Sequence, residues 1–132
     1  KALARVPVEK KADVFMRLFD KSNLVMYGGP RFSPNQVWHR FPLAMAPGVC
    51  FQKIGKLGVQ NFGPWGLKVA GVGVVRWFRL EGKSRKNGAY VHLDGDIGQV
   101  LTMGTDMVIP NPNVDQYIID KIIVNKFELY FT

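Results

Sequence analysis

Histidine, cysteine and aspartate are the first residues of this chain to consider for chemistry, because their side chains bind metals or transfer protons. His39 and His92 are the only histidines, and neither has a cysteine neighbour at a metal-binding spacing. Cys50 is the only cysteine, and it lies among prolines and apolar residues without a neighbouring base. These residues predict neither a metal site nor a catalytic site.

The aspartate and glycine motifs point to the same conclusion. Asp94, Asp96 and Asp106 lack the further ligands and the closing glutamate of a calcium loop. Gly71 and Gly73 are not followed by the third glycine of a dinucleotide-binding motif. We therefore expect a protein that is not an enzyme and that uses no cofactor.

Basic residues are the strongest chemical signal in the sequence. The 132 residues carry 18 Lys and Arg against 10 Asp and Glu, which gives a formal net charge of +8. Such a charge favours an anionic partner, such as nucleic acid, acidic lipid or an acidic protein surface. The residues that we expect to hold phosphate groups, of RNA or of lipid headgroups, are Arg76, Arg79, Lys83, Arg85 and Lys86.

The stretch from Gly63 to Lys83 must position most of these basic residues, and its pattern fits a membrane helix. At about 100° per residue, small residues fall on one helix face, and basic residues, Lys68 among them, fall on the opposite one. Small residues let helices pack closely in lipid, and tryptophan is enriched at membrane–water interfaces. The small residues are Gly63, Gly66, Ala70 and Gly73, and the expected interface anchors are Trp65 and Trp77.

A second interpretation makes part of the same stretch a β-strand. The apolar run Val69–Val75 is shorter than the roughly 20 residues that a spanning helix needs. Asn87-Gly88 is a strong hairpin signal, and it predicts that Val74–Leu80 and Ala89–Leu93 pair as strands. On this interpretation the chain is a soluble basic α+β domain that binds RNA.

The flanking regions predict further short elements. Pro7 is expected to open an amphipathic helix that runs through Ser22, with an apolar face that includes Phe15 and Phe19. Prolines keep the segment 41–49 irregular or only briefly helical. Asn113 and Gln116 resemble a capping box that opens a helix through residue 122. Apolar residues then alternate with polar ones over 126–131, as in a terminal strand.

Three pieces of the chain together resemble subunit g of the mitochondrial ATP synthase, over about residues 18–90. Tyr27–Phe32 looks like the Tyr-x-x-Pro-Arg-Leu segment of that family, and Trp77–Gly82 is similar to its Trp-Phe-x-x-Gly-Glu. The basic residues after Gly82 precede Gly88-Ala89-Tyr90, which matches a Gly-Tyr near the family's end. The family's Gly-x-x-x-Gly after the Trp-Phe is not kept, so helix packing would depend on the earlier small residues.

This resemblance implies a mainly α protein of the mitochondrial inner membrane. An amphipathic N-terminal region (1–57) would precede one transmembrane helix (58–82), and an irregular α/β extension (83–132) would follow. The chain would be a non-catalytic structural subunit of the proton-translocating ATP synthase, beside subunit e, supporting dimerisation and membrane curvature. Cardiolipin would contact the basic end of the helix. The alternatives are a soluble RNA-binding or organellar ribosomal protein and a viral structural protein.

Overall fold

The protein is mostly β, with a single N-terminal helix in the part of the chain that is described. The computed structural model describes residues 6–28, 41–84, 90–98, 107–109 and 111–131. The elements are α1 (Val8–Phe19), β1 (Ser22–Gly28), β2 (Phe41–Val49), β3 (Phe51–Ile54), β4 (Gly58–Asn61), β5 (Trp65–Val69), β6 (Val72–Val74), β7 (Trp77–Ser84), β8 (Tyr90–Gly98), β9 (Met107–Val108), β10 (Asn113–Asp115), β11 (Lys121–Val124) and β12 (Glu128–Tyr130).

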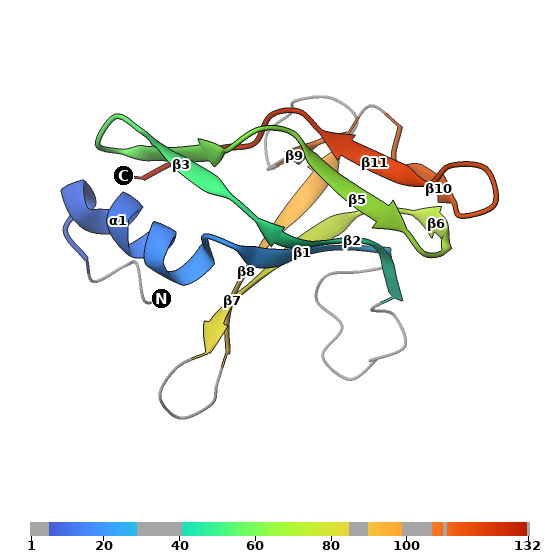
Figure 1. Ribbon diagram of the computed structural model, residues 1–132, viewed down its shortest axis with the longest axis horizontal. Helices are drawn as coiled ribbons and strands as arrows, with labels where there is room; N and C mark the ends of the chain where they lie inside the picture. Colours follow the sequence, from blue (N-terminus) through green and yellow to red (C-terminus); the bar gives the residue numbers. More distant parts are fainter. Residues whose placement is uncertain (1–5, 29–40, 85–89, 99–106, 110, 132) are drawn as a thin grey trace.

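The strands form one large and two small sheets (Figure 1). The large sheet is curled and has the order β11-β5-β2-β1-β7-β8-β9, in which only the β8–β9 pair is parallel. The second sheet has the order β12-β4-β3, and β10 pairs with β6 alone. Because β4 leads into β5 and β11 leads into β12, the pairs β5–β11 and β4–β12 follow one another along the same two segments of chain.

The helix α1 forms because its apolar residues recur at helical spacing and its N-terminus follows Pro7, which has no N–H to satisfy. Ala12, Phe15 and Phe19 lie on its buried face. The helix ends where the Asp20 N–H donates to the Met16 carbonyl, and Asp20 Oδ1 accepts the Phe51 N–H at 2.9 Å. Helix α1 is thereby joined to the start of β3.

The hydrophobic core lies between the helix, the inner face of the large sheet and the three-stranded sheet. An aromatic cluster fills it, with ring centroids 4.9 to 6.2 Å apart. Its members are Phe15, Phe19, Phe51, Trp65, Phe78, Phe127 and Phe131. These seven aromatic residues therefore pack together elements that are distant in sequence.

The expected mainly α fold and the transmembrane helix over 58–82 are wrong. This segment forms β4, β5, β6 and most of β7. Its side chains at 65–69 alternate between buried and exposed, with a period of two rather than 3.6. Within the described ranges, no helix combines the length and apolarity that a membrane crossing needs.

The predicted pairing of two strands on either side of Asn87-Gly88 is confirmed, but the first strand begins at Trp77 rather than at Val74, which pairs with Asn113 instead. Strands β7 and β8 pair antiparallel, with Leu80 opposite Leu93 and Glu81 opposite His92. The turn residues Asn87 and Gly88 themselves lie outside the described residues.

The other local predictions have mixed outcomes. The amphipathic N-terminal helix is confirmed but ends at Phe19, and the terminal strand is confirmed as β12. The irregular segment predicted over 41–49 is wrong, since it forms β2, one edge of which pairs with β1. The helix predicted from Asn113 is also wrong, because Asn113–Asp115 pairs with β6 instead.

The close packing of β7 against helix α1 at Gly82 can be tested by the substitution Gly82→Ala. A Cβ there would lie 2.7 Å from the Leu18 carbonyl oxygen and 2.7 Å from Val91 Cγ2. Because the carbonyl belongs to the helix backbone, Gly82→Ala should lower the free energy of unfolding by about 1–3 kcal/mol, as overpacking does. Urea denaturation measures the change. Gly66→Ala is the matched control, because the nearest atom to its Cβ is Ile123 Cδ1 at 3.6 Å; an equal loss in both variants would contradict the prediction.

Candidate binding surface

The small residues predicted to pack helices do not share a face. Gly63 lies in the turn before β5, with a φ of 74° that favours glycine, and Gly66 lies on the exposed side of β5. Ala70 lies in the link to β6, where its N–H donates to the Leu43 carbonyl, and Gly73 lies in β6. The strand geometry separates these residues, so the helix-packing stripe does not exist.

Both predicted interface anchors are buried. Trp65 is 5% exposed, and its Nε1 donates to the Cys50 carbonyl at 3.1 Å. Trp77 is 1% exposed and stacks on Tyr27, with a centroid distance of 4.3 Å and an interplanar angle of 18°. Neither tryptophan reaches a surface where it could meet lipid headgroups.

The basic residues predicted to bind lipid headgroups have different environments. Arg79 donates two hydrogen bonds to Asp94, at 2.8 and 3.0 Å, and these raise the pKa of its guanidinium above the ordinary value. Arg76 lies exposed between β6 and β7. The side chain of Lys83 and the whole of Arg85 and Lys86 fall outside the described residues. The segment 58–82, whose predicted helix was to bring the basic residues to a membrane surface, forms strands instead.

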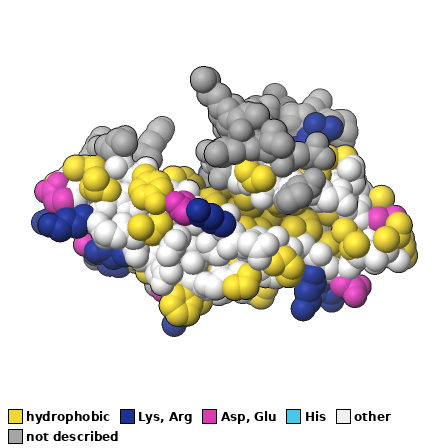
Figure 2. Space-filling model, turned by 90° about the horizontal axis from the view of Figure 1, so that it is seen from above, with side chains coloured by type: hydrophobic (Ala, Val, Ile, Leu, Met, Phe, Trp, Pro, Cys, Tyr) yellow, Lys and Arg dark blue, Asp and Glu magenta, His cyan; other side chains and the backbone are white. Residues whose placement is uncertain are grey.

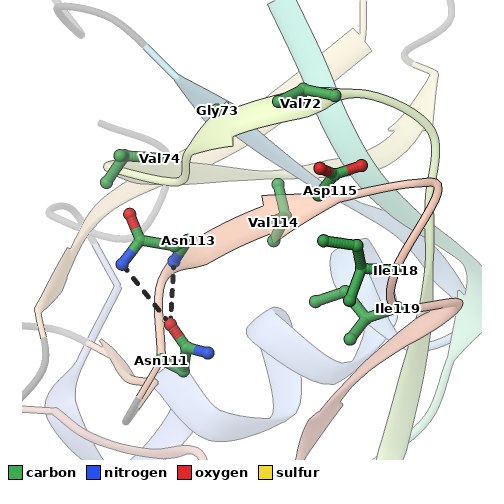
Figure 3. Close-up of a pocket in the computed structure, with 9 residues that line it drawn as sticks. All are labelled: Val72, Gly73, Val74, Asn111, Asn113, Val114, Asp115, Ile118 and Ile119. Carbon is green, nitrogen blue, oxygen red and sulfur yellow. Dashed lines mark hydrogen bonds between the residues drawn. The ribbon is translucent and has the colours of Figure 1, made fainter.

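A recess of about 440 Å³ lies beside β6 and β10 (Figure 3). Its lining is mainly aliphatic and includes Val72, Val114 and Ile118, and the amides of Asn111 and Asn113 are joined by a hydrogen bond. Asp115 is the charged residue of the lining, and its Oδ1 accepts the Tyr117 N–H at 2.9 Å. No three His, Cys, Asp or Glu side chains of the described ranges gather into a possible metal site. The described lining of the recess thus holds one carboxylate, that of Asp115, among mainly aliphatic side chains.

The clearest unsatisfied charge lies on the outer side of the large sheet. Lys121 in β11 lies directly opposite Lys68 in β5, and both side chains are exposed. They begin a cross-strand row that passes through six strands. Its members are Lys121, Lys68, Met45, Val25, Arg79 and Asp94. Arg79 at the far end of the row is neutralised by Asp94, whereas neither lysine forms an ion pair with a described residue.

The two lysines stand at one end of a longer double-stranded ribbon, here called the outer ribbon. It consists of β4–β5 (58–69) and β11–β12 (121–130), and it runs along the top of the molecule in Figure 1. Lys121 and Ile123 are exposed before its midpoint, and Lys126 and Tyr130 are exposed after it. At about 3.3 Å per residue, its exposed side spans at most roughly 30 Å.

The junction in the middle of the outer ribbon is held by one buried side chain. Asn61 is 8% exposed, and its Nδ2 donates to the carbonyls of Gly63 and Asn125 at 2.8 and 3.0 Å. Its Oδ1 accepts the Phe127 N–H at 2.9 Å. The Asn61 side chain thus supplies hydrogen bonds to backbone groups at the point where the two strand pairs meet. It thereby fixes the position of the β5–β11 pair, which carries the two lysines, relative to the β4–β12 pair, which carries Tyr130.

Comparisons with known proteins found no similar protein. No protein-family model matches this chain, and no match is found among curated proteins or solved structures. The transmembrane helix that the resemblance to an ATP synthase membrane subunit implies is overturned by the strands at 58–82.

The sequence interpretation missed the lysine pair. It placed Lys68 on the basic face of a helix and did not single out Lys121. The alternation Trp65-Gly66-Leu67-Lys68-Val69 was the available signal for a strand with Lys68 on its outer side. Nothing in the sequence fixed the register that sets Lys121 opposite it, because the two residues are 53 positions apart.

Proposed function

We propose that this protein is a non-catalytic nucleic-acid-binding domain that holds the phosphate backbone of RNA along the outer ribbon. The observation that carries the proposal is the pairing of Lys121 with Lys68. Like charges directly opposite one another destabilise a sheet. A phosphate placed between the two ammonium groups would offset that repulsion and would gain two charge-assisted contacts.

The charges elsewhere on the chain support a polyanionic partner. The net charge is +8, and three described ion pairs between lysine or arginine and a carboxylate, Lys53–Asp13, Arg79–Asp94 and Lys126–Glu128, already use part of the acidic residues. On the face seen in Figure 2, the coloured Lys and Arg side chains are spread out rather than gathered in one patch. This distribution fits contacts along an extended backbone better than a single small anion.

Nucleic acid is favoured over an acidic lipid surface because of the polar groups on the outer ribbon and on the adjacent strand β3. Gln60 lies opposite Glu128 in the ladder, and Gln52 lies opposite Gln60. Amide side chains can hydrogen-bond to base edges, whereas they bring nothing to the apolar part of a bilayer.

Removing the two lysine charges tests the proposal. The double variant Lys68→Gln/Lys121→Gln should weaken RNA binding on the order of tenfold near 0.1 M salt. It should also reduce the slope of log K against log salt by about 1.4, because each lost contact to a single strand removes about 0.7. Fluorescence anisotropy of a labelled RNA over a salt series measures both quantities.

The matched control is Lys10→Gln/Lys21→Gln, which removes two exposed lysines outside the outer ribbon. Its salt slope should change less than that of the first variant. The free energy of unfolding of Lys68→Gln/Lys121→Gln should stay equal or rise by a few tenths of a kcal/mol, since a repulsion is removed. Equal slopes in the two double variants, or binding to anionic vesicles with none to RNA, would contradict the proposal.

A further inference from the structure

The end of the outer ribbon opposite the lysine pair carries an exposed aromatic ring held in one position. Tyr130 in β12 is 57% exposed and lies opposite Gly58 in β4. A Cβ added at Gly58 would lie 2.8 Å from Tyr130 Cδ1 and 2.9 Å from its Cε1, so the ring packs directly on the glycine backbone. A side chain at position 58 would not permit this close approach of the ring.

The far end of the same ring is fixed by a hydrogen bond. The Tyr130 hydroxyl donates to Glu128 Oε2 at 2.7 Å, and Glu128 Oε1 lies 2.9 Å from Lys126 Nζ. The hydrogen bond to Glu128 raises the pKa of the Tyr130 phenol above its ordinary value, so the ring is uncharged at neutral pH. A ring fixed at both ends loses little side-chain entropy when a flat ligand stacks on it.

Polar and basic residues lie close to Tyr130, in the neighbouring strands and in the link before β12. The row next to it contains Glu128, Gln60 and Gln52. The two glutamines offer amide donors and acceptors, and the Glu128 carboxylate, which accepts from Tyr130 and pairs with Lys126, offers acceptors only. The side chain of Lys126 is 77% exposed, and its Nζ, already 2.9 Å from Glu128 Oε1, has further N–H donors for a phosphate. Base, base edge and phosphate would thus each meet a suitable group within one short stretch of sheet.

From this geometry we infer that Tyr130 is a stacking platform for an unpaired nucleobase, and that the outer ribbon is specific for single-stranded nucleic acid. This inference rests on the proposed function and names the class of its ligand. Aromatic side chains on exposed strands stack on bases only where the bases are not already stacked in a duplex. The lysine pair, by contrast, recognises phosphates in either form.

A tyrosine-specific comparison tests the inference. Tyr130→Leu should weaken binding of a single strand of about ten nucleotides by roughly 5- to 100-fold, the usual effect of losing one stacked base. Binding of a duplex of the same length should change less than about twofold. Tyr117→Leu is the matched control, because Tyr117 is 83% exposed but lies in the turn before β11. Tyr130→Trp should restore the affinity for the single strand.

The outcomes separate this inference from the proposed function. If wild-type protein shows salt-dependent RNA binding and Tyr130→Leu equals Tyr117→Leu, the stacking platform is refuted while the proposed function stands. If wild-type protein binds neither single strand nor duplex, both fail. If Tyr130→Leu weakens both forms equally, the residue supports the fold or the general charge contacts, and the single-strand specificity is refuted. Circular dichroism of each variant checks that it is folded.

Discussion

Replacing Phe15 with alanine should lower the free energy of unfolding by about 3–5 kcal/mol, the largest effect that we expect from a single substitution. The side chain of Phe15 is completely buried. Its ring centroid lies 4.9 Å from Phe19, 5.1 Å from Phe51 and 5.8 Å from Phe131. It therefore joins the helix to β3 and to the residue after β12. Because domains of this size are stable by about 5–15 kcal/mol, urea denaturation should show a large loss.

Two further variants show whether the loss comes from packing. Phe15→Leu keeps much of the volume and should cost clearly less than Phe15→Ala. Val8→Ala lies on the same helix with its side chain 37% exposed, and it should change the free energy by less than about 0.5 kcal/mol. Equal, small effects for Phe15→Ala and Val8→Ala would mean that helix α1 does not pack on the sheets as described.

Local signals predicted the elements whose contacts are close in sequence. The helix at 8–19 could be predicted because its apolar residues recur at helical spacing and are all in one segment. The β7–β8 hairpin could be predicted because the Asn87-Gly88 dipeptide specifies its own turn, and the two strands follow directly. The alternation of Phe127, Leu129 and Phe131 similarly sufficed to predict that this segment is a strand, β12.

The central segment was wrongly predicted to be a helix because each of its small residues occupies its position for a different structural reason. Gly63 is required by a turn with positive φ, and Gly66 lies on the exposed side of β5 beneath the Lys121 stem. These positions happen to fall three or four residues apart, so they imitate a helix face. The buried positions Trp65, Leu67 and Val69 have the true period of two, but five residues are too short a window to outweigh the longer pattern.

The candidate binding surface could not be predicted because it depends on pairing between distant strands. The lysine pair exists only because β11 lies beside β5 in one register, and a slip by one residue would turn Lys121 toward the core. The platform at Tyr130 likewise depends on Gly58, which is 72 positions earlier. The net charge of +8 indicated an anionic partner, but the sequence could not say where it would bind.

Both ends of this surface depend on the junction at Asn61, and Asn61→Ala should lower the free energy of unfolding by about 2–4 kcal/mol. The substitution leaves the Phe127 N–H and the carbonyls of Gly63 and Asn125 without their side-chain partners, and unsatisfied buried groups cost about 1–3 kcal/mol each. Asn61→Asp keeps an acceptor for Phe127 but cannot donate to the two carbonyls, so it should also destabilise.

Asn125→Ala is the control, because its side chain is exposed and only its carbonyl takes part; it should change stability by less than about 0.5 kcal/mol. Thermal and urea denaturation measure the three variants. A loss below about 1 kcal/mol in Asn61→Ala would show that the two strand pairs are held together by their backbone and core contacts alone, and that the lysine pair and Tyr130 do not depend on this side chain for their relative placement.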